Sequence, residues 1–330
     1  MHTVESPPVD NLNAGPGSGH ARTGRASGRR WLITGVVIAL VAAMAAHLVE
    51  KPEELAAFQQ LSTKILLATV LFQFLSQLLW NGAMLLPLRT FMRRLGFWEL
   101  FIVRTGGLVA GYLVPVAGNL AVRMAYLKRR GLTYAEFTWA TIVSNVLALV
   151  SGAALAAAAL VALWKVAGPP PASILGLTAG LMALGVAGVT VLQFLPRLAG
   201  HPRLQKWPWL SGISAFTTSR RTTAWSLALL LMRHCFNFLT FSLLFQSLSQ
   251  TPIVFVTGGL VYAITSPVRM VVITPGNVGI NEWVVAIVGK MLSVDLTTGL
   301  IVALVFRGVS IAGQTLGVLV ASAWLAIKGA

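Results

Sequence analysis

Five arginines of this sequence lie inside apolar stretches, where a charged side chain is costly. They are Arg104, Arg123, Arg233, Arg269 and Arg307. A charge at the centre of a membrane costs several kcal/mol unless it is paired. Glu282 is the carboxylate expected at comparable depth, whereas Glu99, Glu136 and Asp295 fall near the ends of their stretches. Because a planar guanidinium binds phosphate through two parallel hydrogen bonds, the surplus of cations predicts an anionic lipid headgroup as the missing partner.

Two of these arginines are the principal candidates for binding lipid phosphate. Arg233 lies near the middle of the apolar stretch 222–248, and Arg307 lies inside the last stretch, 297–325. Arg123 and Arg269 are further candidates for the same role. They lie, like Arg104, near the ends of interrupted stretches, so reaching out to headgroups or binding free backbone carbonyls explains them equally well.

Four other polar residues are candidates for lining a cavity or coupling transport to protons: Glu282, His234, Asn237 and Asn281. Glu282 follows a glycine-rich turn, so it could cap a helix, couple to protons, or pair with Arg269 or Arg307. We favour an ion pair that also lines the cavity. His234 is expected to be a hydrogen-bonded core residue rather than a proton relay, and Asn281 a turn residue rather than a headgroup donor.

Several classes of function find no support in the sequence. The single cysteine lies inside an apolar stretch, and the five histidines lack the spacing of metal ligands. The sequence has no phosphate-binding loop and no nucleophile and base at a spacing typical of an active site. We therefore expect no catalytic residue, metal or cofactor. The net charge of +16 would suggest nucleic acid in a soluble protein. Here the basic residues cluster between apolar stretches without interleaved aromatic residues, so no nucleic-acid partner is expected.

The composition is that of a membrane protein, with 56% hydrophobic and 10% charged residues. A helix needs about 20 apolar residues to cross a hydrocarbon core of about 30 Å. Six stretches meet this requirement: 31–49, 63–87, 137–163, 173–195, 222–248 and 297–325. Residues 1–30, rich in Gly, Ser, Pro and Arg, are predicted to form a disordered cytoplasmic tail. The first stretch is then expected to be a retained signal anchor rather than a cleaved signal peptide.

Lys and Arg collect at the cytoplasmic ends of membrane spans. Applied along the chain, this rule places both termini on the cytoplasmic side of a cell inner membrane. It also requires two stretches, 97–127 and 252–292, to enter and leave the membrane on the same side. The residues expected to form their turns are Pro115, Gly118, Pro275, Gly276 and Gly279. The sequence therefore predicts an all-α polytopic membrane protein with about six full spans and two oppositely oriented re-entrant hairpins.

The order span, hairpin, span occurs twice, over 63–163 and 222–325, with opposite orientation. The membrane domain, 31–325, would thus contain an inverted repeat joined by the span 173–195, followed by a cytoplasmic end at 326–330. The segment GGLV recurs at 106–109 and 258–261. In secondary transporters, such repeats place the substrate site where the halves meet. GxxxG spacings at 176–180 and 313–317 allow close helix packing within or between chains, so the oligomeric state stays open.

Two segments resemble a known family: PVAGNLAVRMAYLKRRGLTYAEFTWATIVSN at 115–145 and TPGNVGINEWVVAIVGKMLSVDLTTGLIVALVFR at 274–307. This is the flippase-like family that includes the transmembrane region of lysylphosphatidylglycerol synthases, uncharacterised membrane proteins grouped with it, and a hopanoid-biosynthesis-associated relative. The resemblance covers roughly residues 31–325. The family's second motif, PGxxGxxE, is matched by Pro275, Gly276, Gly279 and Glu282, and the arginine of the last span by Arg307.

The family's first motif is matched only in part. Pro115, Gly118 and Arg123 resemble its proline, glycine and arginine, whereas Asn119 replaces its acid. Ser144 and Asn145 replace the Glu-Arg pair that is usual in the next span. These lost acids deepen the surplus of cations and weaken any inference of an identical substrate.

The resemblance implies movement of a lipid between leaflets. In the synthases this region moves an aminoacylated phospholipid that a separate soluble domain makes. The sequence contains no such domain, so we expect no enzymatic lipid aminoacylation. Two hypotheses remain: gradient-driven or facilitated translocation of an anionic or polyprenyl-phosphate-type lipid, and a non-transporting partner that binds or presents lipid to a separate glycosyltransferase or lipid-modifying enzyme.

Overall fold

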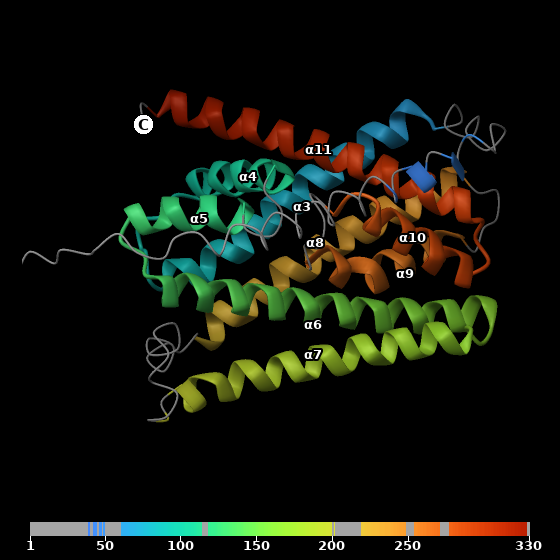
Figure 1. The fold of residues 1–330 in the computed structure, drawn as a ribbon, viewed down its shortest axis with the longest axis horizontal. Coiled ribbons are helices and arrows are strands. Elements are labelled where there is room, and N and C mark those ends of the chain that lie inside the picture. Colours follow the sequence, from blue (N-terminus) through green and yellow to red (C-terminus); the bar gives the residue numbers. More distant parts are fainter. Residues whose placement is uncertain are drawn as a thin grey trace, which may run out of the picture.

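Five long helices form the body of the protein in a computed structural model (Figure 1). The structure describes residues 39, 42–44, 46–47, 49, 61–113, 118–199, 201, 219–248, 254–270 and 277–328. The long helices are α3 (Thr63–Arg89), α6 (Tyr134–Ala167), α7 (Ala172–Ala199), α8 (Arg220–Leu248) and α11 (Leu296–Ile327). Each is long and apolar enough to cross a membrane. They coincide with five of the six predicted spans, which confirms an all-α polytopic membrane protein. The tail 1–30 and most of the stretch 31–49 lie outside the described residues.

Two of the long helices, α6 and α11, have carboxylates that cap free backbone N–H groups at their start. Thr133 and Glu136 form a capping box, in which the Glu136 side chain accepts a hydrogen bond of 2.7 Å from the Thr133 backbone N–H. Asp295 accepts one of 2.7 Å from the backbone N–H of Thr297. These caps occupy two of the carboxylates expected near the ends of stretches, so neither is available to the buried arginines.

The two interrupted stretches form pairs of short helices. The first pair is α4 (Phe97–Leu113) and α5 (Gly118–Arg129). The second pair is α9 (Val254–Thr265), extended by the 3-10 helix η3 (Ser266–Met270), and α10 (Ile280–Met291). None of the four α-helices reaches the length of about 20 residues that crossing a membrane requires. The breaks fall where the sequence predicted turns, while the re-entrant path itself stays a prediction.

The two broken pairs lie toward opposite ends of the long axis of the bundle (Figure 1). The first pair lies at the end where α3 finishes and α6 begins. That end also carries most of the basic residues outside the core, among them Arg89, Arg93, Arg94, Lys128, Arg129, Arg130, Arg197, Arg220, Arg221 and Lys328. At the other end, the described basic residues are Lys64, Lys165 and Lys290. This asymmetry supports the predicted cytoplasmic side, whose assignment rests on the charge rule alone.

Helices of one predicted repeat pack on helices of the other. α3 packs along α8 at the centre, α4 packs on α11, and α9 packs on α6. Each broken pair therefore contacts the long helix that closes the other repeat. Asn145 and Arg307 also occupy equivalent positions, each eleven residues after the first residue of its helix. We therefore keep the inverted repeat as a hypothesis that this packing supports.

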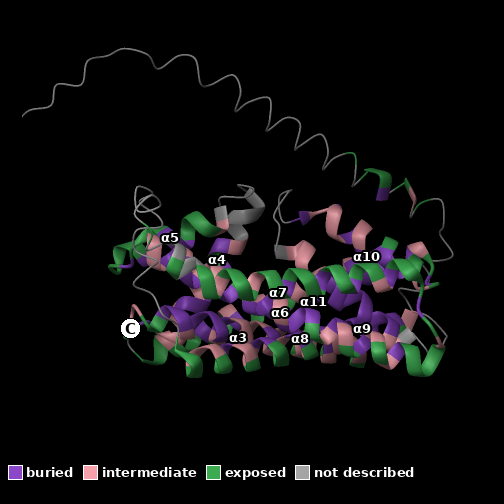
Figure 2. Cartoon of the chain, turned by 90° about the horizontal axis from the view of Figure 1, so that it is seen from below, coloured by how far each residue is buried: buried purple, intermediate pink, exposed green. Residues whose placement is uncertain are grey.

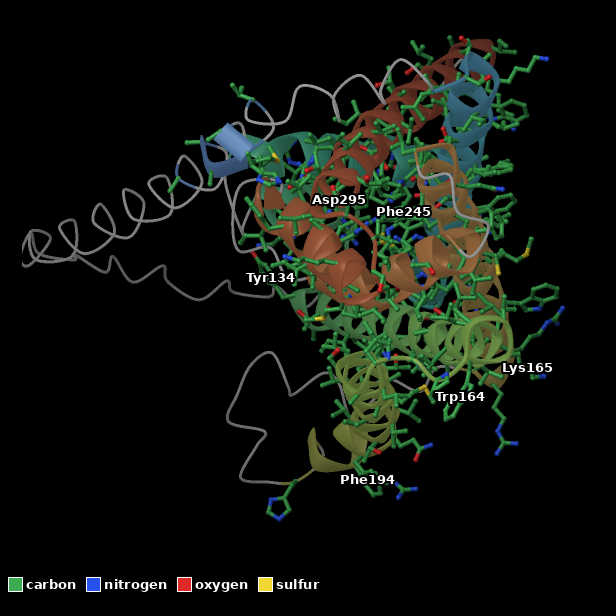
Figure 3. All side chains as sticks on the ribbon, turned by 90° about the vertical axis from the view of Figure 1, so that its right-hand side faces the viewer. Tyr134, Trp164, Lys165, Phe194, Phe245 and Asp295 are labelled. Atoms are coloured by element: carbon green, nitrogen blue, oxygen red, sulfur yellow. The ribbon has the colours of Figure 1, made fainter. Side chains whose placement is uncertain are left out.

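Buried residues gather where α3, α6, α8 and α9 lie together, whereas the outer turns of α7 are exposed (Figure 2). Phe245 is fully buried inside the bundle, whereas Trp164 and Lys165 are exposed near the end of α6 (Figure 3). Leu184 and Val186 on α7 are 58% and 65% exposed. Exposed apolar surface of this kind is expected where a protein faces lipid, and Trp is enriched near the ends of membrane spans.

The two GxxxG spacings have different surroundings. A Cβ atom added at Gly313 would lie 2.8 Å from the backbone N of Phe74 on α3, and one added at Gly317 would lie 2.3 Å from the ring of Phe101. A Cβ atom at Gly176 or Gly180 would meet nothing within 4 Å. The spacing on α11 therefore serves packing within the chain, where α11 approaches α3 and α4.

Gly313→Ala should destabilise the protein, whereas Gly180→Ala should not. Both changes remove a helical glycine and gain similar helix propensity, so the difference isolates packing. Overpacking at Gly313 should cost about 1–3 kcal/mol. Thermal unfolding of the purified variants in detergent measures the effect. Equal midpoints for the two variants would show that α11 does not approach α3 this closely.

Candidate functional site

A cavity of about 400 Å³ lies between the two broken helix pairs. The first pair contributes Arg104 and Arg123, and the second pair, with η3, contributes Arg269 and Asn281. All five arginines singled out in the sequence line this cavity: Arg104, Arg123, Arg233, Arg269 and Arg307. The fold thus brings together cations that are as much as 203 residues apart in the sequence.

Side-chain amides make up much of the remaining polar lining. They are Gln73, Gln77, Asn119, Asn145, Asn237, Asn277, Asn281 and Gln314. No carboxylate occurs among the described lining residues. The cavity therefore presents positive charge and neutral hydrogen-bonding groups, which suits an anion and offers no counter-charge to a cation.

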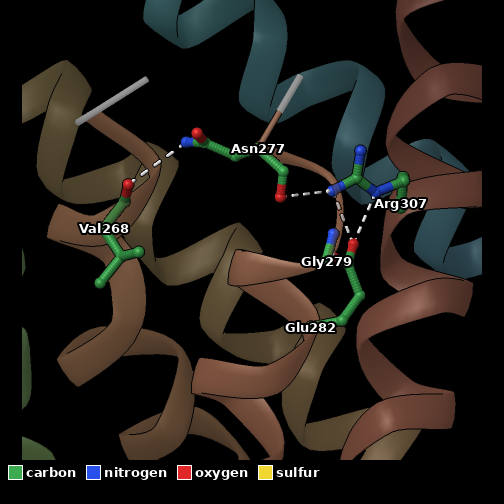
Figure 4. A network of polar contacts seen from close by, with 5 residues as sticks. All are labelled: Val268, Asn277, Gly279, Glu282 and Arg307. Atoms are coloured by element: carbon green, nitrogen blue, oxygen red, sulfur yellow. Dashed lines mark hydrogen bonds and ion pairs between the residues drawn. The ribbon is translucent and has the colours of Figure 1, made fainter. Parts of the chain in front are cut away.

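Among the five cavity arginines, Arg307 forms an ion pair with a described carboxylate, that of Glu282. Its Nη2 and Nε atoms lie 2.6 Å and 2.7 Å from Oε1 of Glu282, and Nη2 also donates to the backbone carbonyl of Asn277 at 3.2 Å (Figure 4). The other oxygen of Glu282 accepts a hydrogen bond of 2.8 Å from the backbone N–H of Gly279. Glu282 thus caps α10 and pairs with Arg307, which joins two of the alternatives left open by the sequence. Contrary to the prediction, Glu282 itself is not among the residues that line the cavity. Because Glu282 offsets its charge, Arg307 contributes less to the cationic surplus than the sequence predicted.

The arginines of the first broken pair are buried in protein. Arg104 and Arg123 are 4% and 7% exposed, so neither side chain reaches out to a membrane surface. Nη2 of Arg104 donates to the side-chain oxygen of Gln77 at 2.9 Å, and its Nε atom has no partner. The guanidinium of Arg123 lies 5.4 Å from the centre of the Phe137 ring, and its Nε atom also lacks a partner. Both side chains keep hydrogen-bonding capacity for a ligand.

Arg233 and Arg269 rest on aromatic rings. The guanidinium of Arg233 lies 4.0 Å from the centre of the Trp80 ring, and that of Arg269 lies 4.3 Å from the centre of the Phe306 ring. The Nε atoms of both, and Nη2 of Arg269, have no hydrogen-bond partner. Cation–π contacts contribute about 0.5–2 kcal/mol each, which does not replace a counter-ion. Together with Arg104 and Arg123, they make four arginines that form no ion pair with a carboxylate of the described chain.

His234 is held by two hydrogen bonds in the core. Its Nε2 atom lies 3.0 Å from the backbone oxygen of Ala148, which can only accept, so Nε2 carries the proton and donates. Its Nδ1 atom then accepts from the hydroxyl of Tyr262 at 2.8 Å. This geometry is the one expected for a core histidine, although His234 also borders the cavity.

Asn237 fastens α8 to α3. Its Nδ2 atom donates to the Ser76 hydroxyl and to the backbone oxygen of Arg233, both at 2.8 Å. Its oxygen accepts from Nε2 of Gln73 at 2.9 Å, and Ser310 of α11 donates to the oxygen of Gln73 at 3.1 Å. This network joins three long helices at the cavity and fixes the backbone that carries Arg233.

Sequence reasoning missed part of the lining. Gln73 and Gln77 lie one helical turn apart in an apolar helix, a signal of an inward-facing polar surface that was available in the sequence. In the sequence, Asn119 and Asn145 stand out only as replacements for charged residues of the family's motifs. Both line the cavity, and Oδ1 of Asn119 is buried without a partner.

Two of the five predicted turn residues lie at the starts of the helices that follow the interruptions. Gly118 begins α5, and Gly279 precedes α10 with a φ of +84°, a conformation that favours glycine. Pro115, Pro275 and Gly276 lie outside the described residues. Asn281, expected to be a turn residue, instead lies in the first turn of α10, and its Oδ1 atom is buried without a partner.

Long apolar helices, two broken helix pairs and a central cationic cavity define a multi-pass, all-α membrane protein. The chain belongs to the family described as the lysylphosphatidylglycerol synthase transmembrane region, whose model matches residues 31–317. This match confirms the resemblance carried by the two motifs. No curated protein and no solved structure shows a significant match to the chain.

Glu282→Ala should destabilise the protein strongly. The change leaves Arg307 without its counter-ion and removes the cap on α10, and breaking a buried ion pair by removing one partner costs about 3–5 kcal/mol. Glu99→Ala is the matched control, because Glu99 pairs at 2.7 Å with Arg130, whose side chain is 56% exposed. We expect thermal unfolding in detergent to show a much smaller loss for the control. Similar losses would argue against a structural role for the Glu282–Arg307 pair.

Proposed function

We propose that the protein moves an anionic or polyprenyl-phosphate-type lipid between the leaflets of the membrane. The observation that carries this proposal is the placement of four arginines without carboxylate partners in one cavity between two broken helix pairs. Buried cations are costly when unpaired. A phosphate headgroup would offset that cost and would accept hydrogen bonds from the free Nε atoms.

The broken helices support translocation because they form walls of the cavity, and in this proposal these walls move during transport. Irregular backbone at membrane depth is tolerated where it lines a cavity, and transporters use such breaks to carry a central site between two accessible states. Each pair packs on a long helix of the other half, α4 on α11 and α9 on α6. A rearrangement of one half would therefore shift the cavity wall of the other. The sequence has no ATPase motif, so we infer gradient-driven or facilitated movement.

The family supports a lipid as the substrate. Its description refers to a synthase of lysylphosphatidylglycerol, a membrane phospholipid. We do not propose catalysis by this chain. Glu282 is bound to Arg307, and no base and nucleophile face each other among the described cavity residues.

The second candidate function is a non-transporting partner that presents lipid to a separate glycosyltransferase or lipid-modifying enzyme. The same cationic cavity would serve it as a lipid-binding site. The two functions differ in one requirement, since a translocator has to open the cavity to both leaflets in turn. Transport in a purified system therefore distinguishes them.

Arg233→Ala should slow transbilayer movement of an anionic lipid at least about tenfold, since a charge-assisted hydrogen bond contributes about 1.5–3 kcal/mol. Proteoliposomes that contain the purified protein and fluorescently labelled phosphatidylglycerol or polyprenyl phosphate measure the rate. Arg220→Ala is the control on the same helix, because Arg220 is exposed at the first residue of α8. It should retain the wild-type rate.

The native lipids that co-purify with each variant give an independent measurement. Arg233→Ala should lose most of the anionic lipid, whereas Arg220→Ala should keep it. Equal losses would remove Arg233 from the site. Binding that depends on Arg233 without any transbilayer movement, from protein shown to be folded, would favour the partner function.

A further inference from the structure

The number of arginines without a carboxylate partner bears on how many negative charges the ligand carries. Arg104, Arg123, Arg233 and Arg269 line one cavity without a carboxylate partner, and Arg307 is offset by Glu282. A phosphodiester headgroup carries one negative charge and would leave most of this positive charge uncompensated. A lipid whose headgroup carries two or more negative charges compensates it better.

The arginines of the two broken pairs form two groups that come from different parts of the fold and line the same cavity. Arg104 and Arg123 come from the first broken pair, and Arg269 comes from the second. Arg233, on the central helix α8, lines the same cavity as both groups. Like charges that share one cavity repel each other, and a ligand with more than one anionic group offsets this repulsion best.

Each broken pair also contributes one asparagine to the cavity lining. Asn119 lies one helical turn from Arg123 on α5, and its Oδ1 atom is buried without a partner. Asn281 lies on α10, and its Oδ1 atom is also buried without a partner. Each broken pair, with η3, therefore contributes arginine and asparagine side chains to the cavity lining.

We propose that the cavity selects a lipid with a polyanionic phosphate headgroup, of the prenyl diphosphate class, over singly charged phosphodiester lipids and aminoacylated lipids. The two arginine groups would hold the two phosphate positions, with Arg233 between them. An aminoacylated phospholipid such as lysylphosphatidylglycerol carries ammonium groups, for which the described lining has no carboxylate. This inference rests on the proposed function in taking the cavity as the headgroup site.

Binding to the purified full chain in detergent tests the selectivity, with isothermal titration calorimetry at one fixed ionic strength. The probes are geranylgeranyl diphosphate, geranylgeranyl monophosphate, short-chain phosphatidylglycerol, short-chain lysylphosphatidylglycerol and inorganic pyrophosphate. We expect the diphosphate lipid to bind at least about tenfold more tightly than phosphatidylglycerol, with the monophosphate between them and the lysyl lipid weakest. Equal affinities, or a preference for either phosphatidylglycerol lipid, would overturn the proposal. Inorganic pyrophosphate binding as tightly as the lipid diphosphate would overturn the assignment to a lipid.

Near-isosteric charge changes test the two positions separately. Asn119→Asp and Asn281→Asp each add one negative charge to the part of the cavity lining that one broken pair contributes. Each should weaken diphosphate binding about tenfold while changing phosphatidylglycerol binding much less. Gln246→Glu, at an exposed position of α8, adds the same charge outside the cavity and should change neither affinity. If both asparagine variants leave diphosphate binding unchanged, the two-position model is wrong.

The outcomes are independent of the transport assay. Selective diphosphate binding without transbilayer movement would support this inference. It would also favour the non-transporting partner function over translocation. Arginine-dependent transport of phosphatidylglycerol without diphosphate selectivity would support the proposed function and overturn the inference. If the asparagine variants fail to fold, the order of affinities for the wild-type chain still decides.

Discussion

Positive charge buried away from water has to be compensated, and the arrangement of this protein follows from how that is done. Arg307 shows the internal solution, in which Glu282 binds the guanidinium and at the same time caps the helix that follows the break. The other four cavity arginines have aromatic rings, an amide or free N–H groups around them in place of a carboxylate. Cation–π contacts and neutral amides offset part of the cost of burial. The remainder is available as binding free energy for an anion.

The surrounding fold keeps these side chains together and keeps the space between them open. The Gln73 and Asn237 network joins α3, α8 and α11 beside the cavity. Gly313 lets α11 approach α3 closely enough for that network to form. Both broken pairs contribute to the cavity lining, and each packs on a long helix of the other predicted repeat. A rigid centre with two interrupted walls is a suitable arrangement for a site that changes access.

The differences from the family's motifs acquire a physical meaning in this setting. Asn119 stands where the family has an acid, and Asn145 stands in place of its arginine, at the helix position that Arg307 occupies in the second half. Arg307 thus has an internal ion pair, whereas the equivalent helix position on α6 carries the neutral amide of Asn145. Without that acid, Arg123 and Arg104 have no internal counter-ion. The change would favour a ligand with more negative charge than the family's description names.

The sequence by itself determined the all-α membrane architecture, the five long described helices, the positions of the two breaks and the surplus of buried cations. These features depend on local properties: apolar runs of spanning length, turn-forming glycines, and caps that lie within three residues of the groups they bind. Only the tertiary structure decided that all five arginines line one cavity and that amides from six helices complete its lining. It also decided that Glu282 forms its ion pair with Arg307 rather than with Arg269. The reason is that partners such as Glu282 and Arg307, or Gln73 and Asn237, lie far apart in sequence. Their meeting depends on how each helix is rotated and how closely its neighbours pack, and small residues such as Gly313 set that distance only once the helices are assembled.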